Sequence, residues 1–336
     1  TRNGYEFVGW TGERITTPQT SVKIPRGSTG NKAYTANWQV IKYTIITLLE
    51  GGNAGSSGAY VYTVEETFTL PTPTRTGYTF WGWTGEGITT PQPNVTIPKG
   101  STGDKTYIEN WVETGYTITL DLNGGSGKEK VIYTMTDEDF ELPTPTRNGY
   151  EFVGWTGERI TTPQTSVKIP KGSTGNKAYT ANWKVIRYTI TLVTNGGAVI
   201  ASIRYTVEDS VTLPIPPERP GYEFAGWVLD GSGQFPSTPM IIPEGSTGDR
   251  IYEAEWRVAT YTITYVSHGR VYNWVQYTIN NSVYFSVPEE DTSYYLPGYT
   301  FVGWKIDGVS GTPRSYMLPK GSYGNRTATM LWEPIP

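Results

Sequence analysis

Gly149-Tyr-Glu-Phe-Val-Gly-Trp155 is the stretch that decides the fold, because the chain of 336 residues contains five versions of it. The pattern Gly-Tyr-x-Phe-x-Gly-Trp begins at Gly4, Gly77, Gly149, Gly221 and Gly298, at intervals of 73, 72, 72 and 77 residues. Self-similarity at a fixed period is typical of repeat architectures. The sequence therefore predicts a tandem array of small units.

A second tryptophan closes each unit 28 or 29 residues after the first. The ten marker tryptophans are Trp10, Trp38, Trp83, Trp111, Trp155, Trp183, Trp227, Trp256, Trp304 and Trp332. Large aromatic side chains supply most of the apolar area that a small core can bury. We interpret the markers as core residues, the alternative being a ladder of exposed sugar-binding rings.

Tyr-Thr-Ile segments after the first four closing tryptophans set the start of each unit. We predict the second half of a repeat at 1–38 (the half-repeat) and complete repeats at 43–111 (repeat I), 116–183 (repeat II), 188–256 (repeat III) and 261–332 (repeat IV, divergent). The missing first half is expected in a longer polypeptide, in which the chain is a monomer.

Repeat II illustrates the elements expected in one unit. Alternating β-formers predict strands at 116–120, 131–134, 149–155 and 179–183, with a turn at 123–125. Gly154 is expected to form a bulge that re-aims Trp155. Residues 156–170 are expected to form an irregular crossover with at most one helical turn. The fold class is mainly β with little helix.

The composition excludes most kinds of catalytic and metal site. There is no cysteine and one histidine, His268, so thiolate metal sites and most catalytic triads are excluded. The net charge of −4 gives no basic excess for nucleic acid, and no apolar run is long enough to span a membrane. We predict no enzyme, no metal and no cofactor.

Several local patterns are weak candidates for chemistry. Gly124–Lys128 lacks the first glycine and the Ser or Thr of a phosphate-binding loop. The acidic runs 137–139 and 289–291 are interpreted as solvated turns rather than a glycosidase pair. A Lys–Asn cross-link would need a triplet that recurs in every repeat, and none does. His268 is interpreted as a hairpin-turn residue.

Repeat IV carries additional aromatic residues outside the markers. The candidate ligand-binding residues among them are Tyr272, Trp274, Tyr277, Tyr294 and Tyr295. Tyrosine and tryptophan are enriched in recognition surfaces. The alternative is that these side chains cover the exposed end of a terminal repeat.

Repeat II also resembles a known family. The matching elements are the 116–120 strand, the 123–125 turn, Leu142–Arg147, Gly149–Trp155, Ile169-Pro170 and Tyr179–Trp183. This combination resembles the internalin B-repeat, or Listeria–Bacteroides repeat, of bacterial surface proteins. The resemblance implies small α+β, β-grasp-like domains with four strands, on secreted or wall-attached proteins. It also implies a stalk or adhesive role without catalytic residues.

The expected function is an extended, non-catalytic stalk on the bacterial cell surface. The segments between repeats, such as 112–115, contain about four residues and so restrict neighbouring domains. Domains about 30 Å across would then give a rod of roughly 130–160 Å. The alternative is a multivalent binding module for a host or cell-wall polymer, either a glycan or a matrix protein.

Overall fold

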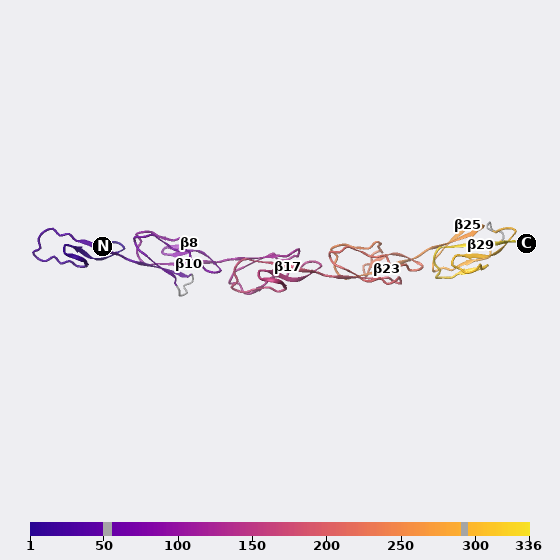
Figure 1. The fold of residues 1–336 in the computed structure, drawn as a ribbon, viewed down its shortest axis with the longest axis horizontal. Coiled ribbons are helices and arrows are strands. Elements are labelled where there is room, and N and C mark those ends of the chain that lie inside the picture. Colours follow the sequence, from indigo (N-terminus) through magenta and orange to yellow (C-terminus); the bar gives the residue numbers. More distant parts are fainter. Residues whose placement is uncertain (50–55, 290–294) are drawn as a thin grey trace. The chain divides into compact units, whose positions relative to one another are not determined.

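A computed structural model describes residues 1–49, 56–289 and 295–336 (Figure 1). These residues form 29 β-strands and no helix. The strands build small sheets that follow one another along the chain. This confirms the prediction of a mainly β tandem repeat. The chain divides into two compact units, Thr1–Pro145 with Val153–Asn182 and Thr146–Phe152 with Trp183–Pro336.

Repeat I shows the plan of one repeat. Its strands are β4 (Tyr43–Leu49), β5 (Ser56–Tyr62), β6 (Phe68–Thr69), β7 (Tyr78–Gly85), β8 (Ile88–Gln92), β9 (Thr96–Ile97) and β10 (Lys105–Glu113). Five of them form one sheet in the order β5-β4-β10-β7-β8, and β6 pairs separately with β9. The central strands β4 and β10 are parallel, whereas all other pairs are antiparallel.

Repeat II and the half-repeat follow the same order. The strands of repeat II are β11 (Tyr116–Asp121), β12 (Lys130–Tyr133), β13 (Phe140–Glu141), β14 (Tyr150–Gly157), β15 (Ile160–Gln164), β16 (Lys168–Ile169) and β17 (Lys177–Val185), in a sheet β12-β11-β17-β14-β15 with a separate β13-β16 pair. The half-repeat has β1 (Tyr5–Gly12), β2 (Ile15–Gln19) and β3 (Thr35–Val40), in the order β2-β1-β3.

Repeats III and IV keep the four central strands. The strands of repeat III are β18 (Tyr188–Val193), β19 (Ile203–Tyr205), β20 (Val211–Thr212), β21 (Tyr222–Leu229), β22 (Ile241–Ile242) and β23 (Arg250–Val258). Those of repeat IV are β24 (Tyr261–Ser267), β25 (Arg270–Tyr277), β26 (Val283–Phe285), β27 (Tyr299–Ile306), β28 (Tyr316–Leu318) and β29 (Arg326–Pro334). The sheets are β19-β18-β23-β21 and β25-β24-β29-β27, and β20-β22 and β26-β28 pair separately.

The predicted irregular crossover at 156–170 is wrong, because it contains the strands β15 and β16 and no helical turn. The equivalent turn of repeat I explains the path. Glu86 and Gly87 have φ of +50° and +83°, which lets a two-residue turn lead directly from β7 into β8. Pro91 lies within β8, and a strand tolerates proline at the edge of a sheet, where β8 lies.

The predicted glycine bulge is confirmed at the positions equivalent to Gly154. In repeat III the register of β21 and β23 shifts between Phe224 and Gly226. Gly226 has φ of +141°, and a Cβ there would lie 2.6 Å from the backbone nitrogen of Ser237. The shift brings Trp227 onto the face of Phe224, so that their rings meet edge-on with centroids 5.5 Å apart.

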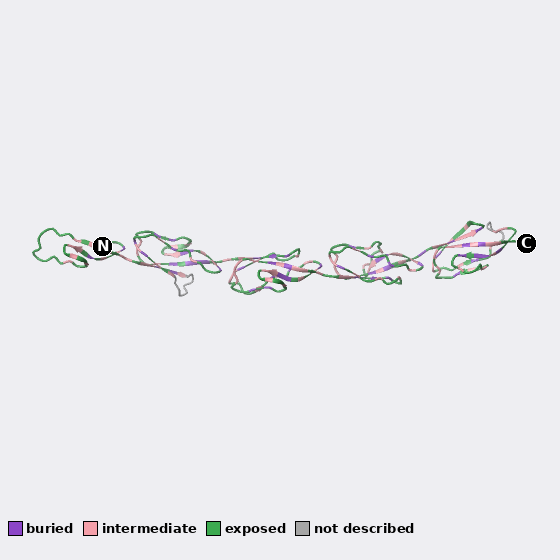
Figure 2. Cartoon of the chain, viewed as in Figure 1, coloured by how far each residue is buried: buried purple, intermediate pink, exposed green. Residues whose placement is uncertain are grey.

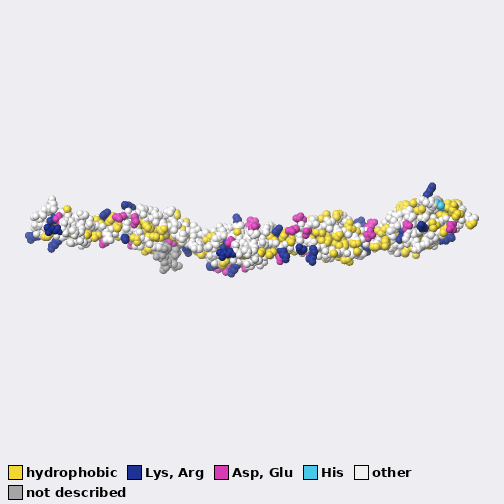
Figure 3. Space-filling model, viewed as in Figure 1, with side chains coloured by type: hydrophobic (Ala, Val, Ile, Leu, Met, Phe, Trp, Pro, Cys, Tyr) yellow, Lys and Arg dark blue, Asp and Glu magenta, His cyan; other side chains and the backbone are white. Residues whose placement is uncertain are grey.

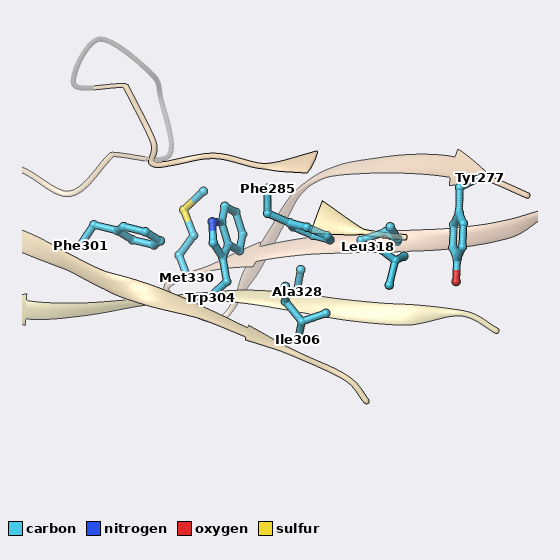
Figure 4. Close-up of a cluster of buried hydrophobic side chains, with 9 residues drawn as sticks. Tyr277, Phe285, Phe301, Trp304, Ile306, Leu318, Ala328 and Met330 are labelled. Carbon is cyan, nitrogen blue, oxygen red and sulfur yellow. The ribbon is translucent and has the colours of Figure 1, made fainter. Parts of the chain in front are cut away.

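Buried residues recur in each complete repeat (Figure 2), and the first marker tryptophan of each is among them. In repeat IV, Trp304 packs among Phe285, Phe301 and Met330 (Figure 4). Burying one such ring removes roughly 150–250 Å² from water, which is worth about 4–6 kcal/mol before entropy is subtracted. These cores stabilise repeats that contain no disulfide.

Candidate functional site

The junctions between repeats are shorter than the sequence predicted. The closing strands continue two residues beyond their marker tryptophans, so that only two residues separate β10 from β11 and β23 from β24. One of the two is held by its own repeat. The backbone N–H of Thr114 donates to the carbonyl oxygen of Gly77 at 2.9 Å, and Ala259 donates to Gly221 at 2.9 Å.

The glycine that begins each marker pattern contacts the following repeat. We call Gly4, Gly77, Gly149 and Gly221 the junction glycines, and Val64, Met135, Val207 and Ile279 the junction side chains. A Cβ built on any junction glycine would overlap the junction side chain of the next repeat. In each pair, the glycine and the side chain belong to the same compact unit. A side chain at any of these positions would force the junction side chain of the next repeat to shift.

Hydrogen bonds fix each junction side chain in a tight turn. In repeat III the carboxylate of Asp209 accepts from the backbone N–H of Thr206 at 2.8 Å and from its hydroxyl at 2.7 Å. Such Asx and related turns substitute for regular backbone pairing. The carbonyl oxygen of Val207 accepts from the N–H of Gly245 at 2.7 Å. The turn that contains Val207 is therefore fixed by the Asp209 side chain and by the backbone of Gly245.

Two junctions add a hydrogen bond between a tyrosine and a glutamate. Tyr5 donates its hydroxyl to Glu65 at 2.6 Å, and Tyr150 donates to Glu208 at 2.5 Å. The hydrogen bond, followed by desolvation, raises the pKa of Tyr5 and of Tyr150 above its ordinary value. At the junction of repeats I and II, Thr136 instead donates to Glu113 at 2.8 Å.

The sequence carried a signal for these junctions that the repeat markers did not reveal. A Tyr-Thr-apolar triplet begins at the last residue of the second strand in every complete repeat: Tyr62–Val64, Tyr133–Met135, Tyr205–Val207 and Tyr277–Ile279. The tyrosine is buried, and its hydroxyl donates to a turn carbonyl, as from Tyr205 to Gly248 at 2.5 Å. An apolar residue two positions after the end of this strand, in a turn, is an indication of contact outside the repeat.

The marker tryptophans divide into two sets. The first tryptophan of each complete repeat is at most 3% exposed: Trp83, Trp155, Trp227 and Trp304. Of the closing set, Trp111 is buried, and Trp38, Trp183, Trp256 and Trp332 are partly buried. Trp10 of the half-repeat is 38% exposed, in a groove of about 780 Å³ that Phe7 and Trp38 also line. The groove corresponds to the core face of a complete repeat.

The candidate ligand-binding residues of repeat IV do not form one surface. Tyr272 lines a cavity of about 310 Å³, and its ring lies 5.9 Å from that of Tyr265. Trp274 is 62% exposed on the other face of the sheet. Tyr295 packs edge-on against the closing Trp332 at 5.3 Å. Tyr294 lies outside the described residues.

Tyr277 is not available to a ligand, which corrects its inclusion in that set. It is 2% exposed and donates its hydroxyl to the carbonyl oxygen of Gly324 at 2.6 Å. Tyr62 makes the equivalent bond to Gly103 at 2.6 Å, so this tyrosine is a core residue of the repeat.

Amide and acidic side chains have structural partners. Asn182 donates to the carbonyl oxygen of the bulge residue Gly154 at 3.1 Å and to the Thr156 hydroxyl at 2.9 Å. Glu138 pairs with Lys171 at 2.6 Å. Asp139 pairs with Lys168 at 2.7 Å, and this hydrogen bond lowers the pKa of the Asp139 carboxyl.

His268 has φ of +50° in the β24–β25 turn, hydrogen bonds through Nδ1 to Ser267 at 2.9 Å and stacks on Trp332.

Acidic and basic side chains are mixed over the visible face (Figure 3). Residues 1–49, 56–289 and 295–336 contain no group of three or more His, Asp or Glu placed to hold a metal. In the same ranges there is no helix with the length and hydropathy needed to cross a membrane.

Comparison with known proteins confirms the resemblance. Residues 43–107, 116–182, 188–247 and 261–321 match the model of the Listeria–Bacteroides repeat domain, and residues 1–42 match that of the divergent InlB B-repeat domain. A "Putative Gly-rich membrane protein" of Evansella cellulosilytica is 27% identical over 91% of the chain and 36% of its own length. A "Putative membrane protein" of the same bacterium is 26% identical over 81% of the chain and 40% of its own length.

Internalin H of Listeria monocytogenes is 34% identical over 83 residues, which are 25% of this chain and 15% of internalin H. The chain thus spans well under half the length of the curated relatives that it matches.

Proposed function

The chain belongs to the Listeria–Bacteroides repeat family, and from that premise we propose that it is a non-catalytic spacer in a bacterial surface protein. In this proposal the repeats form an extended stalk outside the cell. The names of the relatives, two membrane proteins and an internalin, support such a location.

The repeated junction is the observation that carries this proposal. A junction glycine, a junction side chain and a two-residue connection recur four times between successive repeats. A connection this short cannot act as a flexible tether, because its reach is only a few ångströms per residue. The contact at the glycine further restricts bending. An array restricted at every junction stays extended, and its length increases with the number of repeats.

We also propose the predicted boundaries, 43–111, 116–183, 188–256 and 261–332, as the folding units of this stalk. Parallel central strands flanked by antiparallel ones support a β-grasp-like description of each unit. In the same proposal, residues 1–38 are the second half of a further repeat, and the chain is a monomer.

Small-angle X-ray scattering of the whole chain tests the stalk. Domains about 30 Å across predict a maximum dimension of roughly 130–160 Å. A matched variant with ten Gly and Ser residues inserted between Ile186 and Arg187 should give a broader distribution of dimensions, because its connection is flexible. A maximum dimension below about 80 Å for the unmodified chain would contradict the proposal.

A second candidate function is multivalent binding of a glycan or matrix protein. The observation that favours it is the exposure of Trp81 and Trp274, which are 58% and 62% exposed. Exposed tryptophans are energetically important in many recognition surfaces.

A further inference from the structure

The first and last strands of every complete repeat are direct neighbours and run parallel. They pair as β4 with β10, β11 with β17, β18 with β23 and β24 with β29. In repeat III the chain enters β18 at Tyr188 and leaves β23 at Val258. Because the two strands are parallel, the entry and the exit lie at opposite ends of the pair. A pull along the chain therefore slides one strand past the other.

Sliding is a loading that a strand pair resists well. All hydrogen bonds between the two strands stretch at once, whereas peeling breaks them one after another. In β18 and β23 these bonds extend from Ile190 opposite Arg250 to Val193 opposite Glu253. Ile190 and Leu192 are buried, and hydrogen bonds beside a buried core are electrostatically stronger than those in water.

A side-chain hydrogen bond extends the parallel pair at the end where the chain enters. The backbone N–H of Thr189 donates to the carboxylate of Asp249 at 2.8 Å. The acceptor is the residue directly before the last strand, so the bond ties the first strand to the last one where the pull arrives. The same bond recurs in the other complete repeats, from Thr44 to Asp104 at 2.7 Å, from Thr117 to Asn176 at 2.8 Å and from Thr262 to Asn325 at 2.8 Å.

A second side chain extends the pair at its other end in repeats II and III. Asn195 follows β18 and donates to the carbonyl oxygen of Ala254 in β23 at 3.2 Å. Asn123 donates in the same way to Ala181 at 3.2 Å. The asparagine of the Asn-Gly-Gly turn thus joins the first strand to the last, in addition to shaping the turn.

We propose that each complete repeat resists tension along the chain, and that its parallel first and last strands are the element that carries the force. We call this strand pair, with the Asp or Asn that accepts from the first strand, the clamp. The proposal rests on the spacer function and deepens it, because a surface spacer is under tension whenever the parts that it separates are pulled apart. The clamp would let the spacer transmit that pull without unfolding.

Optical tweezers test the clamp by pulling the same repeat in two directions. The chain contains no cysteine, so handles can be attached to the whole chain at introduced cysteine pairs. Arg187→Cys with Thr260→Cys flanks repeat III and slides β18 against β23. Glu223→Cys with Arg257→Cys joins the handles to opposite residues of β21 and β23 and peels these strands apart. All four side chains are exposed.

At equal force, repeat III should unfold about tenfold more slowly or more in the sliding direction than in the peeling direction, since forced unfolding is governed by the unfolding rate. This comparison needs no destabilising substitution, because the core is the same in both measurements.

Asp249→Ala in each cysteine-pair variant separates the clamp from ordinary stability. It removes the acceptor of the Thr189 N–H and should accelerate unfolding about fivefold in the sliding direction. It should leave the rate in the peeling direction unchanged, because β21 and β23 then separate first. Asp249→Asn is the matched control, since Asn176 and Asn325 accept the same bond in repeats II and IV. It should retain most of the resistance.

Equal unfolding rates in the two directions would overturn the proposal. So would an equal acceleration by Asp249→Ala in both, because the bond would then contribute to stability alone. The scattering test of the stalk involves no force. A chain that is extended in solution but yields equally in both directions would keep the spacer function and reject the clamp, so the two proposals fail separately.

Discussion

Repeats III and IV have the same core but differ at one glycine. Gly221 and Gly298 begin the same marker pattern and have similar backbone conformations, with φ of +83° and +79°. A Cβ on Gly221 would overlap Ile279 of the following repeat, whereas a Cβ on Gly298 would meet no described atom within 4 Å. The same turn glycine thus serves the fold of both repeats and, in repeat III, a junction as well.

This difference separates two contributions to stability that the sequence motif combines. The left-handed turn requires glycine in both repeats. The contact with the next repeat requires it only at the junction. Substitutions at matched positions in the two repeats can therefore measure the junction alone.

The largest effects are expected in the core, where the two repeats should respond alike. Trp227→Ala and Trp304→Ala each remove a ring that is at most 3% exposed. Each should lower the stability of its own repeat by about 3–5 kcal/mol, since a cavity replaces the ring. Hydrogen exchange of the amides in β23 and β29 measures the loss. A much smaller effect in one repeat would show that the cores are not equivalent.

The junction should appear as a difference between Gly221→Ala and Gly298→Ala. Both introduce a Cβ at positive φ, at a cost of about 1–2 kcal/mol. Only Gly221→Ala adds overlap with Ile279, which should cost about 1–3 kcal/mol more. The exchange of the Ala259 amide, bonded to Gly221, reports on one site, and that of Ile335, bonded to Gly298, on the other.

Ile279→Ala supplies the matched control for this pair. Combined with Gly221→Ala, it should remove most of the additional loss, because the methyl group then has space. Equal effects of the two glycine substitutions would argue against a specific junction contact.

A smaller effect is expected for Tyr150→Phe, which removes the hydrogen bond to Glu208 across the junction of repeats II and III. Exchange of the Ile186 amide, which donates to Gly149, should accelerate a few-fold. Tyr299 has the equivalent position in repeat IV, and no hydrogen bond joins its hydroxyl to another repeat among the described residues, so Tyr299→Phe should leave the amide of Ile335 unchanged. An equal response at both sites would assign the effect to the ring rather than to the junction.

The smallest expected effect is on pH dependence. Because the pKa of Tyr150 is raised by the bond to Glu208, its contribution to stability is complete below its ordinary pKa of about 10 and is lost as the pH rises through the raised value. Spectrophotometric titration should show that Tyr150→Phe removes a phenol that ionises at a higher pH than an ordinary tyrosine. Glu208→Gln should lower the pKa of that phenol, and an unchanged titration would contradict the assignment.

The sequence was sufficient for features that depend on neighbours along the chain. Alternation gave the strands that begin at Tyr116 and Tyr150, and the glycine before the marker tryptophan gave the bulge. The edge strand β15 was not predicted, because it contains Pro163. Proline is tolerated in β15 because the strand lies at the edge of its sheet, and the local sequence does not show this position.

Features that depend on distant residues were not predictable in the same way. Gly149 and Val207 are 58 residues apart, and only the fold brings them together. Tyr277 was placed in the ligand-binding set because it lies in a repeat rich in aromatic residues. The Tyr-Thr-apolar triplet that it shares with Tyr205 was visible in the sequence, but the position of this tyrosine in the core depends on the register of the second strand.

The most direct test of the junctions is a distance measurement across one of them. Because the chain contains no cysteine, spin labels can be placed specifically at Ser202→Cys in repeat III and Ser315→Cys in repeat IV. Double electron–electron resonance should give one narrow distance distribution, as narrow as that of a control pair within repeat III at Ser202 and Glu244. The additional substitution Gly221→Ala should broaden the distance distribution between Ser202 and Ser315 and leave that of the control pair unchanged. A broad or multiple distribution in the otherwise unmodified chain would contradict restricted junctions.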